Sequence, residues 1–348
     1  MPSRTEDETR AAVGADRVAG TGSAGGPVRR GGPHPATGVW LFPDAPAVAI
    51  VAAAHRAEQL GFDEFWLGDE GPARDPFTLL AAAAAVTSRI RLGVAVTNPY
   101  VRHAAMTAVS AMTIAELSGG RFVLGIGPGG SISLDPLGIA RKKPLSRTRD
   151  AVRIIRAVSN GVATDGFTPP PNPFRVRRLP IYIGARGEGF NRFASQETDG
   201  VFVGGVPMPV HGLVLGWARS VRPIKAALYV SAVFDPAEEE RVRPRLIFGL
   251  LDAPQEYRDA LGVKLENVQA AAAAVAAGDL GPARKIVSDR VFDALALHGS
   301  PEEVGRGLAH LVELHRPTSV GVSLLARDPV AALEPAAVAF HHMKEVLA

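Results

Sequence analysis

Short runs of apolar residues recur along most of this 348-residue chain, with longer amphipathic stretches between them. These runs are mostly apolar throughout and lack a strict apolar–polar alternation, which is the pattern of parallel strands covered on both faces. We expect eight of them to form strands: 38–42, 64–67, 90–96, 121–126, 181–183, 201–203, 228–233 and 319–324. Because these strands alternate with helical patterns, the sequence predicts an α/β fold, a closed (β/α)8 TIM barrel with insertions.

The connecting stretches predict helices over 45–60, 76–87, 104–117, 147–159 and 190–197. For the first helix, we expect Asp44 to be the N-cap and Gly61 to end it. Residues 165–178 include three consecutive prolines, so we expect a loop there. The helical region over 236–298 is longer than one crossover needs, and we expect an insertion at that point.

The first 35 residues differ from the remainder, because they are rich in Gly, Arg, Pro and Ser and have no apolar core. We expect 1–35 to be a disordered N-terminal extension and 36–348 to be the barrel domain.

Composition excludes several classes of function. The net charge is only +3, and no basic run carries interleaved aromatic residues, so a nucleic-acid partner is not expected. No run reaches the roughly 18 apolar residues that a membrane span requires, so we expect no membrane partner. The chain has no cysteine, which excludes disulfides and fits a cytoplasmic protein. The histidines lack the spacing of a metal-binding motif, and no metal site is predicted.

Candidate functional residues follow the strands, because the active site of a parallel barrel lies at the carboxyl ends of its strands. Asp69 and Glu70 come after the second predicted strand, and their carboxyl groups suit polar contacts or proton transfer. A solvated turn with a helix cap is the alternative. Thr97 and Asn98 begin a crowded polar and aromatic loop after the third strand, for which a simple proline turn is the alternative.

Two further junctions are rich in glycine. Gly125, Gly127 and Gly130 match the spacing of a dinucleotide-binding motif, but Pro128 lies inside the turn and 131–143 shows no helical periodicity. A dinucleotide-binding helix is therefore not expected, although the glycines suggest a close approach of the backbone to a flat or phosphorylated group. The stretch 184–189 precedes a helix and suits an anion, or is an ordinary turn.

The third and fourth junctions also carry a family resemblance. The run LGVAVTNPYVRH, which ends at His103, and the run ELSGGRFVLGIGPG, which ends at Gly129, resemble the bacterial luciferase-like superfamily. Within it the sequence is most similar to methylenetetrahydromethanopterin reductase, an enzyme family that depends on the deazaflavin coenzyme F420. The likeness extends over nearly the whole chain after the N-terminal extension.

The resemblance implies a cofactor that lies across the carboxyl ends of the strands, and commonly a homodimer. It implies a non-prolyl cis peptide between Ala95 and Val96, against the back of the deazaflavin ring. Asp69 would contact the ring, with Thr97 and Asn98 beside it. The other residues implied to approach the cofactor are Gly127, Gly129, Gly130, Ser131, Gly184, Ala185, Arg186 and Gly187.

Two positions depart from the family pattern. Glu70 stands where the superfamily usually has histidine, and Trp40 stands where the reductase has a glutamate that handles protons. We hypothesise that Glu70 is the catalytic acid–base group, with a pKa raised by desolvation. Trp40 would stack on the substrate or ring, or else would fill the barrel. Arg186 and Arg327 are candidates for pairing with the acidic tail of the cofactor.

These features predict an F420-dependent oxidoreductase that transfers hydride between the deazaflavin and a small organic substrate, at a C=C, C=N or alcohol/carbonyl group. One alternative is an FMN-dependent luciferase-like monooxygenase on the same barrel. The other is a barrel that binds a cofactor without catalysing a reaction.

Overall fold

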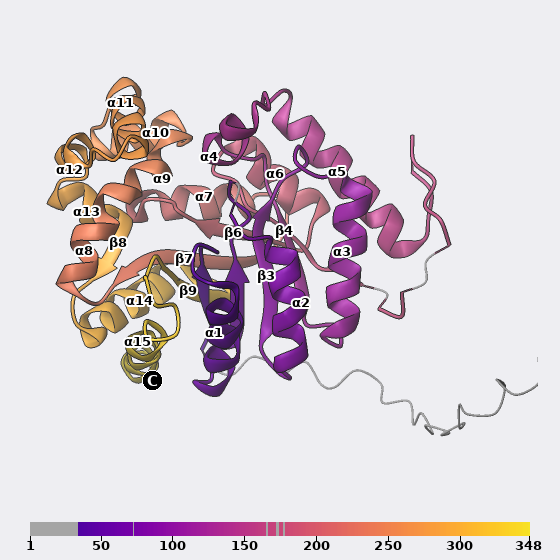
Figure 1. Cartoon of the computed structure of the whole chain (residues 1–348), viewed down its shortest axis with the longest axis horizontal. Helices are drawn as coiled ribbons and strands as arrows, with labels where there is room; N and C mark the ends of the chain where they lie inside the picture. The colour runs from indigo at the N-terminus through magenta and orange to yellow at the C-terminus, as the bar shows by residue number, and fades with distance from the viewer. Residues whose placement is uncertain (1–33, 72, 165, 172–173, 177) are drawn as a thin grey trace, which may run out of the picture. The chain divides into compact units, whose positions relative to one another are not determined.

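Nine parallel strands in one sheet organise the fold (Figure 1). The computed structural model describes residues 34–71, 73–164, 166–171, 174–176 and 178–348. Nearly all of the predicted N-terminal extension lies outside the described residues. The strands are β1 (Ala36–Leu41), β2 (Glu64–Leu67), β3 (Arg91–Thr97), β4 (Phe122–Ile126), β5 (Ile181–Ile183), β6 (Gly200–Gly204), β7 (Lys225–Val233), β8 (Ala296–His298) and β9 (Ser319–Leu324).

Eight of these strands close into a ring. Strands β1 to β7 pair in sequence order, and β9 pairs with both β7 and β1, so the barrel has no free edge. The predicted (β/α)8 barrel is confirmed, and each of the eight predicted strands has its counterpart in the ring. Strand β8 is not among the predicted strands; it pairs with Ser231–Val233 at the carboxyl end of β7.

Helices cover the outside of the ring. The barrel helices are α1 (Ala47–Gln59), α2 (Pro76–Val86), α3 (Ala104–Leu117), α5 (Pro144–Asn160), α6 (Glu188–Glu197), α7 (His211–Ala218), α14 (Pro301–His315) and α15 (Leu333–Val346). A helical turn, α4 (Ser131–Leu134), follows β4 and continues into a 3-10 turn. None of the helices that the structure describes is long and apolar enough to cross a membrane.

One predicted helix boundary is wrong. Pro46, and not Asp44, is the N-cap of α1, and it makes no side-chain capping bond. Proline lacks an N–H and has a fixed φ, so it suits the start of a helix, and the helical backbone begins only at Ala47. The predicted end is confirmed, since Gly61 follows the last turn with a φ of +86°.

The predicted insertion is confirmed as a group of six helices between β7 and β8. They are α8 (Pro236–Val242), α9 (Ile247–Leu251), α10 (Gln255–Leu261), α11 (Leu265–Ala276), α12 (Gly281–Ile286) and α13 (Asp289–Leu295). In Figure 1 these helices lie together, away from α1, α2 and α3. They pack around their own apolar core, which includes Leu250, Val268 and Phe292.

Large aromatic side chains fill the interior of the ring. Trp66, Tyr182, Phe202 and Tyr229 form one buried cluster, in which the Phe202 and Tyr229 rings stack at 4.7 Å. Glycines on neighbouring strands provide the space for these rings. A Cβ atom on Gly93 of β3 would lie 2.2 Å from Cε3 of Trp66, and one on Gly321 of β9 would lie 2.0 Å from Cε1 of Tyr229.

A buried carboxylate connects this cluster. Glu64 is almost inaccessible to solvent and accepts hydrogen bonds from Trp66 Nε1 and the Tyr229 hydroxyl, each at 3.0 Å. The guanidinium of Arg91 forms an ion pair with the same carboxylate. A buried charge is tolerated when it is paired and hydrogen-bonded in this way.

We predict that Gly93→Ala lowers the free energy of unfolding by about 1–3 kcal/mol, because the added methyl group meets the Trp66 ring. Gly216→Ala in α7 is the matched control, since a Cβ there has no neighbour within 4 Å. The control is expected to stabilise by roughly 0.5–1 kcal/mol, as alanine favours helix over glycine. Urea unfolding of both variants tests this, and equal stability would refute the packing argument.

Candidate functional site

The carboxyl ends of β2 to β5 lie side by side, so the predicted site residues meet at one rim of the barrel. The Gly127 amide donates to the Thr97 carbonyl at 2.8 Å, and the Gly184 amide donates to the Ile126 carbonyl at 3.1 Å. The Gly71 amide donates to the Ser133 hydroxyl at 3.2 Å. These bonds bring together three of the four loops that carry the candidate residues, 97–98, 127–131 and 184–187, and place the start of the loop after β2 beside α4.

Trp40 and Ala95 are joined at the top of the barrel interior. The peptide bond between Ala95 and Val96 is cis, as the family resemblance implies. The Trp40 indole donates its N–H to the Ala95 carbonyl at 2.7 Å, and the ring packs beside the aromatic cluster. The indole N–H is therefore engaged by the backbone of β3, and Trp40 is in part a barrel-filling residue.

Val96 occupies space that three glycines leave open. A Cβ atom would lie 3.0 Å from a Val96 methyl group at Gly125, 2.8 Å at Gly127 and 2.4 Å at Gly184. An even closer neighbour is the Val94 carbonyl oxygen at Gly125 and the Gly184 carbonyl oxygen at Gly127, each at 2.3 Å. Close packing against the backbone and Val96 therefore explains these glycines without a phosphate. Their approach to a cofactor stays a prediction.

The turn after β4 differs from the prediction at one point. Residues 131–143 were expected to lack helix, yet α4 begins at Ser131. The Asp252 carboxylate accepts from the Ser131 amide at 2.7 Å and from the Ser131 hydroxyl at 2.9 Å, which fixes the first turn. The helix is only four residues long and the next long helix, α5, begins at Pro144, so the dinucleotide-binding motif is not formed.

Asp69 and Glu70 are half-buried carboxyl groups at the end of β2. Burial raises the pKa of Asp69, while a hydrogen bond from the Thr97 side chain and the charge of Arg102 oppose that rise. Burial also raises the pKa of Glu70, and the charge of Asp69 adds to the effect. The nearby Arg186 guanidinium acts in the opposite direction on Glu70. A carboxyl group with a raised pKa can hold a proton closer to neutral pH.

Arg186 lies between Glu70 and the insertion. Its guanidinium donates to the Gly249 carbonyl, and its own carbonyl accepts from the Tyr257 hydroxyl at 2.6 Å. Arg327, the other predicted cation, is exposed after β9.

Sequence reasoning missed Asp252, Tyr257 and Arg141. Asp252 and Tyr257 belong to the insertion, and Asp252 is 121 residues from Ser131 along the chain. Arg141 forms an ion pair with Asp252 at 3.0 Å and donates to the Gly129 carbonyl at 2.9 Å. No local motif marks these residues, because their role arises only when distant segments meet.

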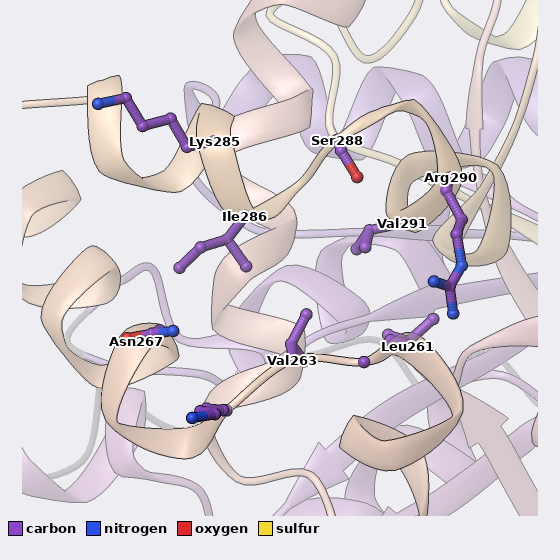
Figure 2. A pocket seen from close by; sticks show the side chains of 10 residues that line it. Leu261, Val263, Asn267, Lys285, Ile286, Ser288, Arg290 and Val291 are labelled. Atoms are coloured by element: carbon purple, nitrogen blue, oxygen red, sulfur yellow. The ribbon is translucent and has the colours of Figure 1, made fainter.

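A cavity of about 370 Å³ lies within the insertion, and Figure 2 shows its lining. Its walls come from 261–267 and 285–291 and include none of the predicted site residues. Among the residues that the structure describes, no three His, Asp or Glu side chains are grouped so that they could hold a metal ion.

The barrel and its rim define the class of protein. A family model described as luciferase-like monooxygenase matches residues 27–316. The chain therefore belongs to the luciferase-like family, and the predicted family is confirmed.

Within this family, the chain is similar to reductases that act on methanopterin compounds. The chain is 30% identical to 5,10-methylenetetrahydromethanopterin reductase of Methanolobus tindarius over 295 residues, which cover 80% of this chain and 90% of that protein. It is 31% identical to the reductase of Archaeoglobus fulgidus over 288 residues, or 77% and 87% of the two chains. The solved coenzyme F420-dependent tetrahydromethanopterin reductase of Methanopyrus kandleri matches with a TM-score of 0.74 at 25% identity, over 88% of this chain and 99% of that one.

We predict opposite effects of two substitutions on the pKa of Glu70. Asp69→Asn removes a like charge and lowers this pKa, whereas Arg186→Gln removes an opposite charge and raises it. Titration of the Glu70 carboxyl carbon by NMR in both variants measures the shifts. Shifts of the same sign in both variants would contradict the arrangement of charges at the rim.

Proposed function

We propose that this protein is an F420-dependent oxidoreductase with a small organic substrate. The observation that carries the proposal is the group of Asp69, Glu70 and Arg186 at the carboxyl ends of the strands, where two adjacent carboxyl groups have raised pKa values and the Arg186 guanidinium lies near Glu70. The similarity to the solved reductase of Methanopyrus kandleri supports F420 over the FMN alternative, because that reductase depends on coenzyme F420.

The residues at the rim fit a flat, anionic cofactor. Gly127, Gly184, Ala185 and Gly187 present little side chain. We expect a planar ring to approach the backbone at Gly187, where a Cβ atom would meet nothing within 4 Å, and to meet Val96 in front of Gly127 and Gly184. Val96 stands among the glycines and would support one face of the ring. Asp69 would contact the polar edge of the ring, and Arg186 provides a cation for an acidic group of the cofactor.

The remaining predicted residues would complete the cofactor site. Thr97 and Asn98 lie directly after the cis peptide, and both are buried. The side-chain oxygen Oδ1 of Asn98 accepts from the backbone amides of Tyr100 and Val101, which fixes the loop beside the ring position. Gly129, Gly130 and Ser131 would line the side nearest α4.

When bound, coenzyme F420 supplies the hydride chemistry, while the protein orients the reactants and manages protons. Glu70 would donate a proton to, or accept one from, the substrate atom next to the carbon that exchanges hydride. Its raised pKa suits this role, since a general acid works best when its pKa approaches the working pH. Trp40 would bound the substrate space, with its N–H already bonded to Ala95.

Glu70 and Trp40 depart from the family pattern at positions that would face the substrate, so the substrate of the relatives is not carried over to this protein. We propose a C=C, C=N or alcohol/carbonyl group as the reacting group, without assigning the substrate of the methanopterin reductases. An FMN-dependent monooxygenase and a non-catalytic cofactor-binding barrel are the competing functions.

The first test is a fluorescence titration of the purified protein with coenzyme F420 and, separately, with FMN. We expect saturable binding of F420 and much weaker binding of FMN. Tighter binding of FMN would favour the monooxygenase, and binding of neither would overturn the proposal.

The second test addresses catalysis. We predict that Glu70→Gln lowers the turnover rate by about 10²–10⁴-fold, the usual contribution of a general acid–base group. Its dissociation constant for F420 should stay close to that of the wild type, because the amide has nearly the same shape. Hydride transfer from alcohols to oxidised F420 is followed through the loss of F420 absorbance, and hydride transfer from reduced F420 to imines and enones is followed through its gain. Unchanged turnover would remove Glu70 from the mechanism, and absence of turnover in the wild-type protein would favour the non-catalytic barrel.

We further propose a cytoplasmic homodimer. The absence of cysteine suits a reducing compartment. The adjacent helices α2 and α3 expose Val86, Met106, Val109 and Leu117, and a second copy that covers these side chains would remove their apolar surface from water. Light scattering that gives the mass of one chain at micromolar concentration would refute the dimer.

A further inference from the structure

The turn that follows β4 has little order of its own. Three of the four residues in 127–130 are glycine, and Gly129 has a φ of +70°. Glycine loses more conformational freedom on folding than any other residue, so this turn requires external contacts to hold one conformation. At its barrel end the contact is the bond between the Gly127 amide and the Thr97 carbonyl.

At the other end the turn is held by the insertion. Asp252 accepts two hydrogen bonds from Ser131 and pairs with Arg141, and Arg141 in turn donates to the Gly129 carbonyl. Asp252 and Arg141 thus connect the two ends of 129–131, and the turn between them is held in one conformation. The absence of a side chain at Gly130 admits the carboxylate, because a Cβ there would lie 3.2 Å from Asp252 Oδ2.

The same stretch of the insertion also holds the loop after β5. The Gly249 carbonyl accepts from the Arg186 guanidinium, and the buried Tyr257 hydroxyl donates to the Arg186 carbonyl. Residues 249–257 thus contact both loops that the proposed function assigns to the cofactor. Leu250 of this stretch packs in the apolar core of the insertion, whereas Ala253 and Tyr257 pack in the core of the barrel, so both cores hold the stretch in place.

We propose that residues 249–257 position the two cofactor-binding loops, and that Asp252 is the positioning residue for the glycine turn. This inference rests on the proposed function, since the loops are cofactor loops only if the protein binds F420. Asp252 acts through Ser131 and Arg141. The charged bonds it accepts are the strong kind, so their loss should loosen the turn without unfolding the barrel.

The test compares Asp252→Asn with the wild-type protein. Asparagine keeps the shape of the side chain but has one acceptor oxygen and no charge. We expect the dissociation constant for F420 to rise about tenfold, the effect of losing one or two charge-assisted bonds. The turnover rate at saturating F420 should change much less. Hydrogen–deuterium exchange of the free protein should become faster at 127–131 and stay unchanged in the strands.

Asp259→Asn is the matched control, because Asp259 is an exposed carboxylate of α10 that accepts only from Gln255 among the described residues. It should leave affinity and exchange as in the wild type. A combined Asp252→Asn and Ser131→Ala variant should lose less affinity than the product of the two single losses, because both changes break the same bonds.

The outcomes separate this inference from the proposed function. If the wild-type protein does not bind F420, the proposed function fails, and faster exchange at 127–131 in Asp252→Asn would still establish that Asp252 orders the turn. If the wild type binds F420 but Asp252→Asn binds it equally well, the positioning role is overturned. An equal loss in Asp259→Asn would also overturn it, because the effect would then be general to the insertion.

Discussion

The closure of eight parallel strands into a ring requires that the enclosed space be filled, since a parallel sheet is stable only when both faces are covered. Here a few large rings fill much of that space, and glycines on the facing strands accommodate them. The buried Glu64 carboxylate connects two of the rings by hydrogen bonds, and the partly exposed Arg91 guanidinium pairs with its charge. The position of every strand end, and so of every rim loop, depends on this packing.

At the carboxyl ends of the strands, glycines again make room for a larger side chain. Val96 fits among three glycines as the aromatic rings do below, and the Trp40 indole holds the carbonyl that precedes it. The candidate site is therefore continuous with the barrel core. Asp69 and Glu70 stand beside this layer, where reduced solvation accounts for their raised pKa values.

The sequence predicts the ring well because each strand is a local, continuously apolar run, and because helix ends such as Gly61 depend on neighbours in the chain. It assigns the N-cap of α1 to Asp44 wrongly, because aspartate is a common N-cap residue, whereas the helical backbone begins only at Ala47, after Pro46. It misses Asp252 and Tyr257 altogether, since their contacts join segments far apart in the sequence. The motif spacing at Gly125 and Gly127 suggests a flat or phosphorylated ligand, whereas in the structure close contact with the carbonyl oxygens of Val94 and Gly184 is a sufficient cause.

The separate core of the insertion has a consequence for how such a protein can change over time. Side chains inside that core pack against one another and against Val233 of β7, and they form a cluster distinct from the aromatic cluster of the ring. Substitutions among them can therefore reshape the outer wall of the rim while the ring keeps its geometry. Related proteins that keep the hydrogen bonds made by 249–257 can therefore differ in substrate through changes in the insertion. The residues at the strand ends, and the chemistry that they support, would stay the same.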